Sequence, residues 1–240
     1  MSQEYLSNVE LYFSTDISDG YIQMPAEESK HISRVMRHTT GEEIFVTDGK
    51  GSIYKTSIIE VCSSTVTLRI VGTRTYENKF DNVTFCIPRL KSNDRFEFAL
   101  EKSVELGITN FLVFNSDRTI AKGEKLDRWN KITQAAMKQS LRSYLPKIQF
   151  VKSIERIIQL EGKKYLFDQN ADIKLKDHLI NHSDFNSDQN YFIFGPEGGL
   201  SEKEISDLDS SELVALTPNR LRSETAIVTA ASILSQLNLD

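Results

Sequence analysis

The sequence predicts an α/β protein of two domains, a small β-barrel followed by a mostly parallel sheet flanked by helices. Three observations support this prediction. Residues 1–72 hold short segments rich in Ile, Val, Thr and Phe, residues 73–81 are polar and turn-rich, and apolar strands alternate with helices over residues 82–240. Such alternation is typical of a parallel sheet covered by helices. We therefore expect a first domain at 1–72, a linker at 73–81 and a second domain at 82–240.

Three segments of the first domain are short and rich in β-branched or aromatic residues, which predicts strands. They are residues 43–48, 53–61 and 65–71. One helix is expected across residues 25–40, where Ile32, Val35 and Met36 would share one face. Gly41 then follows as a stop signal. Several short strands with one helix indicate a small barrel.

The second domain is expected to alternate strands and helices along its whole length. The predicted strands are 83–88, 111–114, 147–151, 163–167, 191–194 and 213–216. The predicted helices are 92–106, 126–144, 201–208 and 223–237. Ligands of parallel sheets gather at the loops beyond the carboxyl ends of the strands, so these loops are where a site is expected.

Composition is typical of a soluble globular protein, with 39% hydrophobic and 26% charged residues. The chain has no apolar run of the length, about 18 residues, that a membrane span needs. Residues 1–9 lack the basic and then apolar pattern of a secretory signal. Cys62 and Cys86 lie far apart, which argues against a disulfide framework and fits a reducing compartment. We therefore expect a cytoplasmic protein without a membrane partner.

Charge is spread unevenly along the chain. The net charge of −5 argues mildly against a nucleic-acid partner. Residues 118–152, however, carry nine Lys or Arg against two acidic residues, and residues 30–38 hold three more basic residues and two histidines. A phosphate backbone responds to such a local patch rather than to the total. The same pattern also fits solvated helix faces, and charge alone leaves both interpretations open.

The most informative loop is Gly195–Gly199 (GPEGG), which directly follows the apolar strand at 191–194. Three glycines in five residues allow positive φ and let a ligand approach the main chain closely. Ser201 and Glu204 have the spacing of a capping box, which predicts the start of a helix. This arrangement can hold a ligand, although an ordinary tight turn between a strand and a helix has the same pattern.

A second loop, Leu216–Thr225, also leaves an apolar strand and opens a helix. Its hydroxyl side chains can cap that helix, and Glu224 suits the positive end of the helix dipole. Arg220 and Arg222 can bind a phosphate or a carboxylate, and surface ion pairs would explain them equally well. The loop is therefore a candidate for an anionic ligand.

A third loop, Phe167–Ala171, follows the strand at 163–167 and is polar and turn-like. The nucleotide-binding patterns GxxxxGK[ST] and GxGxxG after a strand are missing, and so is the hydrolase pattern GxSxG. His178 and His182 have a spacing that could pair them on a metal ion, but no third ligand is evident. No metal site is expected.

The loops GPEGGLSEKEI (195–205) and LTPNRLRSETA (216–226) together resemble those of the trefoil-knotted SPOUT methyltransferases. The most similar group is the bacterial family that methylates N3 of a uridine in 16S ribosomal RNA. The resemblance covers nearly the whole chain. It continues over residues 91–107 and 135–140, and in the first domain over His31, Arg34–Arg37, Gly41 and Asp48-Gly49, which resemble a PUA-like domain. The chain departs from the family at Lys138 and Thr217, where an acidic residue and a glycine are usual.

The resemblance implies a PUA-like RNA-docking domain followed by a sheet whose C-terminus threads a deep trefoil knot. It also implies a homodimer that holds S-adenosylmethionine in the knot, with main-chain polar groups of the three loops reading the adenine. The residues expected to bind this cofactor are Phe167, Phe194, Gly195, Glu197, Gly198, Gly199, Leu216, Pro218, Asn219 and Leu221.

The activity that the resemblance implies is methylation of N3 of one uridine in 16S ribosomal RNA, either free or in the small ribosomal subunit. Arg222 is expected to stabilise the uracil oxygen or to anchor a phosphate. Glu224 could orient the substrate or act as a base, and helix capping is its simpler role. The expected RNA contacts are Arg34, Arg37, Arg89 and Arg142. Two alternatives stay open: methylation of another RNA such as transfer RNA, and a non-catalytic RNA-binding knot protein.

Overall fold

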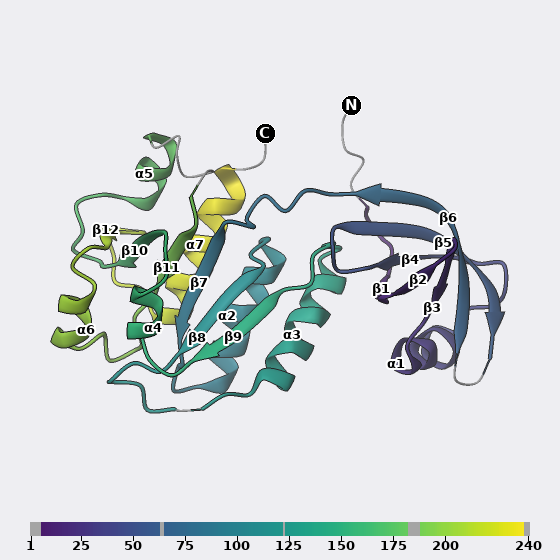
Figure 1. The fold of residues 1–240 in the computed structure, drawn as a ribbon, viewed down its shortest axis with the longest axis horizontal. Helices are drawn as coiled ribbons and strands as arrows, with labels where there is room; N and C mark the ends of the chain where they lie inside the picture. Colours follow the sequence, from purple (N-terminus) through teal and green to yellow (C-terminus); the bar gives the residue numbers. More distant parts are fainter. Residues whose placement is uncertain (1–5, 63–64, 122, 182–187, 238–240) are drawn as a thin grey trace. The chain divides into compact units, whose positions relative to one another are not determined.

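The computed structural model describes residues 6–62, 65–121, 123–181 and 188–237, which form two compact units (Figure 1). The first unit comprises Met1–Asn78 together with Met137–Leu145, and the second comprises Lys79–Ala136 and Pro146–Asp240. Each unit has its own sheet. The domain limits expected at residues 72 and 82 stay a prediction.

The first unit is built on a six-stranded sheet in the order β1-β4-β5-β6-β3-β2. All neighbouring strands are antiparallel except β1 and β4, which are parallel. Apolar residues such as Ile22, Ile44 and Leu68 form its buried core. The elements are β1 (Leu11–Phe13), β2 (Asp16–Ser18), β3 (Tyr21–Gln23), α1 (Ala26–Lys30), η1 (His31–Val35), β4 (Glu43–Thr47), β5 (Ser52–Val61) and β6 (Val66–Thr75).

The helix expected at 25–40 is shorter than predicted and ends in a π-helical turn, η1. Ile32 is fully buried, whereas Val35 is 67% exposed and Met36 is 39% exposed. The shared apolar face was therefore wrong, because a π turn advances more residues per turn than the 3.6 on which the prediction relied. Arg37 follows with φ of +58°, a left-handed conformation that ends the helix before Gly41.

The second unit contains a six-stranded, wholly parallel sheet in the order β12-β10-β11-β7-β8-β9. Strands β7 and β11 are buried along their whole length, as expected for strands covered on both faces. The strands are β7 (Val83–Pro88), β8 (Asn110–Phe114), β9 (Lys147–Val151), β10 (Lys163–Phe167), β11 (Asn190–Ile193) and β12 (Glu212–Val214). The two sheets confirm the predicted fold class.

Among the helices of the second unit, α7 packs against α2 and α5, and α4 packs against α6. They are α2 (Asn93–Glu105), α3 (Leu126–Gln139), α4 (Glu155–Ile158), α5 (Leu175–Asn181), α6 (Glu202–Asp207) and α7 (Ser223–Leu237). The helix expected at 126–144 ends at Gln139, and Leu141 has φ of +56°. Residues 137–145 then join the first unit, where Thr47 Oγ1 and Gly51 N donate to the Ser143 carbonyl. No helix among the described residues is long and apolar enough to cross a membrane.

Strand order decides where the loops meet. β10 lies between β12 and β11, and all three strands run in the same direction. Their carboxyl ends therefore reach one edge of the sheet. The loops that follow them are those at 167–171, 195–199 and 216–222, so the fold brings together three segments that are up to about fifty residues apart in the sequence.

Candidate active site

A cavity of about 930 Å³ opens at this edge of the parallel sheet. Residues from all three loops line it, and the apolar ends of β10 and β12 form part of its wall. A volume of this size suits a cofactor or a drug-sized ligand, and a largely apolar lining with a few polar groups is usual for such sites.

The glycine turn, residues 195–199, forms one side of the cavity. It closes with a hydrogen bond of 2.9 Å from Gly199 N to the Pro196 carbonyl, and Gly199 has φ of +71°. Of the three glycines, only this one has positive φ, so it alone uses the conformational freedom of glycine. The helix after the turn begins with the predicted capping box, in which Ser201 and Glu204 bond to each other's backbone N–H.

Neighbouring segments hold the glycine turn from two sides. The Glu197 carboxylate accepts a 3.0 Å bond from the backbone N–H of Lys91, in the loop after β7. The Ser223 hydroxyl, at the start of α7, donates to the Gly195 carbonyl at 2.8 Å. The turn is thus bonded to the loop after β7 and to the start of α7, of which the second lines the cavity.

The loop after β10 contributes an aromatic wall. The Phe167 ring stacks on the Phe194 ring, with centroids 4.6 Å apart and planes at 15°. Asp168 N donates to the Val214 carbonyl of β12 at 3.1 Å, and the Asp168 carboxylate accepts from Asn170 N at 2.7 Å. These bonds fix the first turn of the loop, so that Asp168, Gln169 and Asn170 line the cavity.

The loop before α7 brings charge to the cavity. Arg220 and Arg222 both line it, and both side chains are exposed. Glu224 does not line it. Its carboxylate is buried in the first turn of α7, and Oε1 lies 3.6 Å from Nε of Arg95, a residue of α2 that does line the cavity. Glu224 therefore sits where it can hold Arg95 in place.

Of the ten residues expected to bind the cofactor, eight line the cavity, and Gly198 and Pro218 do not. Contact with a cofactor stays a prediction for all ten. Sequence reasoning missed Arg95, because nothing in its neighbourhood marks it as different from other charged residues on a helix. The packing of α2 against α7 is what carries it to the cavity.

The arginines expected to contact RNA have different surroundings. Arg34, Arg37 and Arg142 are exposed, and all three belong to the first unit. Arg89 is only 2% exposed, and its guanidinium lies 4.8 Å from the ring centroid of Phe96 and 5.0 Å from that of Trp129.

Burial lowers the pKa of the Arg89 side chain, and its Nη2 donates to Asn93 at 3.1 Å. This packing does not fit the expectation that Arg89 contacts RNA, because a phosphate cannot reach a buried guanidinium. The side chain instead joins the start of α2 to α3.

No group of three or more residues suited to a metal occurs in the part of the chain that the structure describes. Nε2 of His178 lies 3.3 Å from the Glu212 carboxylate, and its ring packs edge-on against Tyr165, so this histidine has a structural environment. His182, its expected partner, lies outside the described residues.

A parallel α/β unit with a cavity formed by three strand-end loops, joined to a β-rich unit, defines a class of two-domain α/β proteins with a ligand site at the carboxyl edge of the sheet. Comparison with family models agrees. An RNA methyltransferase domain matches residues 77–235, and an RNA methyltransferase PUA domain matches residues 25–71. The chain belongs to the RNA methyltransferase family, in the group of the ribosomal RNA small subunit methyltransferases E.

Two curated relatives illustrate the similarity, both called ribosomal RNA small subunit methyltransferase E. The one from Bacillus subtilis is 27% identical over 224 residues, which cover 87% of each chain. The one from Mesomycoplasma hyopneumoniae is 30% identical over 167 residues, which cover 67% of this chain and 70% of the relative.

Solved structures give the same result. A ribosomal RNA small subunit methyltransferase E from Neisseria gonorrhoeae, bound to S-adenosyl methionine, superposes with a TM-score of 0.84 at 26% identity, covering 96% of this chain and 98% of the other. A probable rRNA methyltransferase from Porphyromonas gingivalis has a TM-score of 0.81 at 25% identity, covering 95% and 98%. These structural neighbours confirm the predicted SPOUT fold.

Proposed function

We propose that this protein transfers a methyl group from S-adenosylmethionine to N3 of one uridine in 16S ribosomal RNA. The observation that carries the proposal is the cavity of about 930 Å³ bounded by three strand-end loops that are distant in the sequence. The relative from Neisseria gonorrhoeae, which aligns over nearly the whole chain, was crystallised with S-adenosyl methionine. We expect the reaction to take place in the cytoplasm, where small ribosomal subunits are assembled.

The residues around the cavity fit such a cofactor. Leu166, Leu213 and Leu216 offer apolar surface to an adenine ring, and the loops present main-chain groups that can read its edge. Glu197 and Asp168 are acidic residues of the cavity lining, and negative charge there suits the positive charge of a sulfonium and of an amino group. When bound, S-adenosylmethionine supplies a methyl group that is electrophilic because it is attached to this sulfonium.

The side chains of the protein must activate and orient the uracil. Uracil N3 carries a proton in the neutral base, so the uracil becomes a nucleophile when that proton passes to solvent water. Arg222 is exposed and lines the cavity, and its guanidinium can stabilise the negative charge that then forms on the uracil oxygens. In this proposal Glu224 holds Arg95 beside it, rather than removing the proton itself.

The RNA is proposed to dock on the first unit. Arg34 is exposed within η1 and Arg37 just after it, and Arg142 is exposed in the segment that follows α3 and belongs to this unit. Replacing Arg37 or Arg142 by alanine should weaken RNA binding at every sequence and reduce its salt dependence, because each residue would neutralise a phosphate. Unchanged binding of both variants in a salt titration would place the docking surface elsewhere.

The protein is also proposed to act as a homodimer, as the resemblance to the family implies. Sedimentation equilibrium would measure its mass directly. A mass of 54.8 kDa, twice the 27.4 kDa of the chain, is expected, and a monomer at micromolar concentration would contradict the proposal.

The experiment that tests the function compares 16S ribosomal RNA from cells with and without this protein by mass spectrometry of nucleosides and fragments. Loss of one N3-methyluridine, restored by the purified protein acting on isolated small subunits, is the expected result. Methylation of transfer RNA instead would favour the first alternative, and binding of RNA without any methylation would favour the second.

A further inference from the structure

The loop after β8, residues 115–119, lies beside the glycine turn without lining the cavity. Nη1 of Arg118 donates to the Gly198 carbonyl at 3.2 Å. A β-carbon built on Gly198 would lie 3.5 Å from Cβ of Arg118, so the two segments are already in close packing. Because the Arg118 side chain is exposed, removing it leaves no buried cavity.

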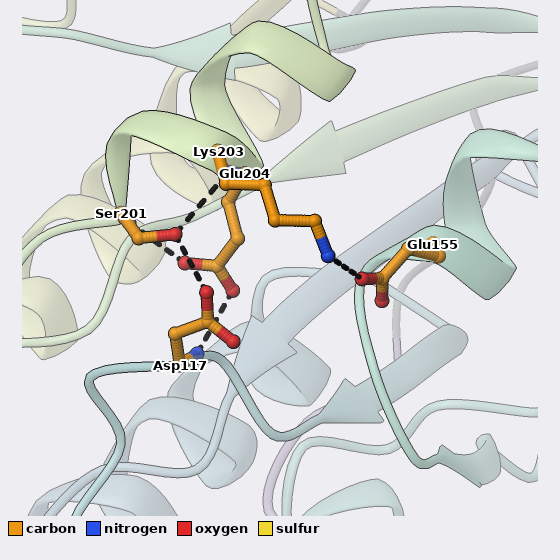
Figure 2. A network of polar contacts seen from close by, with 5 residues as sticks. All are labelled: Asp117, Glu155, Ser201, Lys203 and Glu204. Carbon is orange, nitrogen blue, oxygen red and sulfur yellow. Dashed lines mark hydrogen bonds and ion pairs between the residues drawn. The ribbon is translucent and has the colours of Figure 1, made fainter.

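A buried carboxylate fastens the same loop to the residues just after the turn (Figure 2). Glu204 is 3% exposed, and its Oε1 accepts a 3.0 Å bond from Asp117 N while its Oε2 accepts a 2.8 Å bond from Ser201 N. The Ser201 hydroxyl in turn donates to the Asp117 carboxylate at 2.7 Å. Both Glu204 oxygens are satisfied by backbone N–H groups from two distant segments, which makes this bond pair geometrically demanding.

The ion pair in Figure 2 is separate from the hydrogen-bonded latch of Asp117, Ser201 and Glu204. Nζ of Lys203 lies 3.3 Å from the Glu155 carboxylate, with side chains 70% and 43% exposed. That pair joins α6 to α4 and does not touch the glycine turn. It therefore offers a control in which a charge next to Glu204 is removed without loosening the turn.

We propose that Arg118 is a positioning residue of the cofactor site, and that the latch of Asp117, Ser201 and Glu204 supports it. Together they fix the glycine turn in the shape that presents its main chain to the cofactor. The inference rests on the proposed function, and it assigns Arg118 to the cofactor rather than to the RNA, although this residue opens the basic segment 118–152.

The physical reason is preorganisation. The turn contains two glycines in succession, and the second has positive φ, so the free turn has many accessible conformations. The Glu197 carboxylate is bonded to the loop after β7, and the Gly195 carbonyl is bonded to the start of α7. The Gly198 carbonyl is instead bonded to the Arg118 side chain. Without that bond the ligand must order the turn on binding, which lowers its affinity.

The test replaces Arg118 by alanine and by lysine and measures binding of S-adenosylmethionine by calorimetry, together with steady-state kinetics on small ribosomal subunits. For Arg118→Ala we expect the Kd and the KM for S-adenosylmethionine to rise about three- to tenfold, the range of one hydrogen bond. The kcat, the KM for RNA and the melting temperature should stay close to those of the wild type. Arg118→Lys should recover part of the affinity, because it keeps a donor but not the reach of the guanidinium.

Two further variants check the assignment. Glu204→Gln places an amide N–H₂ against a backbone N–H and should raise the same Kd, whereas Lys203→Ala should bind the cofactor like the wild type. The inference is overturned if Arg118→Ala binds the cofactor as tightly as the wild type, or if only its KM for RNA rises. If the wild-type protein itself binds no S-adenosylmethionine, the proposed function fails instead.

Discussion

The conformation of Gly199 allows a matched pair of substitutions within one turn. Gly199 has φ of +71°, whereas Gly198 does not have positive φ. A β-carbon on Gly199 would meet only Nη1 of Arg118, at 3.9 Å, and one on Gly198 would meet Cβ of the same residue at 3.5 Å. Both distances are ordinary van der Waals contacts, so steric clash does not separate the two sites and backbone conformation does.

The expected magnitudes follow from this geometry. Alanine at either site lowers the entropy of the unfolded chain, which stabilises the protein by about 0.4–1 kcal/mol where the backbone is compatible. At Gly199 a left-handed alanine costs about 1–2 kcal/mol. Gly199→Ala should therefore have a free energy of unfolding about 1–2 kcal/mol below that of Gly198→Ala. Gly199→Asn should lie between them, because asparagine tolerates this conformation.

The assay is urea unfolding of each variant without ligand, followed by fluorescence of the single, fully buried Trp129. The unfolding slope should stay the same in all variants, since the exposed surface does not change. The reasoning would be refuted if the free energies of unfolding of the two alanine variants agreed within about 0.3 kcal/mol, well below the cost of one left-handed residue.

Three further results are expected. Arg222→Ala should lower kcat by about a hundredfold or more while the melting temperature is kept, because it removes a donor to the charged uracil; unchanged turnover contradicts this role. Glu224→Gln should reduce kcat by about tenfold or less, because a partly exposed pair with Arg95 contributes little, and a loss near the upper end of the general-base range, about 10⁴-fold, would identify it as the base. Burial raises the pKa of the Cys86 thiol well above its usual range, while a hydrogen bond to Glu60 raises the pKa of exposed Cys62 more mildly. Alkylation of the native protein at pH 8 should therefore modify Cys62 alone, and rapid labelling of Cys86 would contradict its burial.

The same burial sets a pH dependence of stability. The Cys86 thiol stays protonated in the folded state, whereas in the unfolded chain it ionises near its ordinary pKa, about 8.5. The unfolded state then binds fewer protons, so the free energy of unfolding should fall as pH rises above that value. Cys86→Ala would remove this part of the dependence, and urea unfolding at pH 7 and pH 10 would measure the difference.

The sequence predicted the arrangement of the cavity better than its chemistry. Alternating strands and helices imply parallel strands, and parallel strands place their following loops at one edge, so the turns at 167–171, 195–199 and 216–221 could be expected together. The strand order β12-β10-β11 confirms that expectation, because the three strands are direct neighbours. Here local pattern and global topology agree, as they usually do in natural sequences.

Other features depend on tertiary contacts that no local pattern encodes. Arg89 was expected at an RNA surface, but it is buried between Phe96 and Trp129. Arg95 had no predicted role, and the packing of α2 against α7 carries it to the cavity and to Glu224. In both cases the local sequence shows the loop or helix to which a residue belongs, but not which residues pack against it.

Backbone conformation was a second source of error. The helix expected to continue to residue 144 ends before Leu141, which has positive φ. A bulky residue such as leucine rarely adopts this conformation. Tertiary bonds such as that from Thr47 to the Ser143 carbonyl offset this strain. A sequence window cannot show a partner that lies ninety-six residues away.

The most direct test of the account is a crystal structure of this protein grown with S-adenosylmethionine. The account predicts density for the cofactor inside the cavity, with its adenine in contact with main-chain groups of residues 167–171, 195–199 and 216–221. Density at another place on the protein, or an adenine held only by side chains outside these three loops, would contradict it.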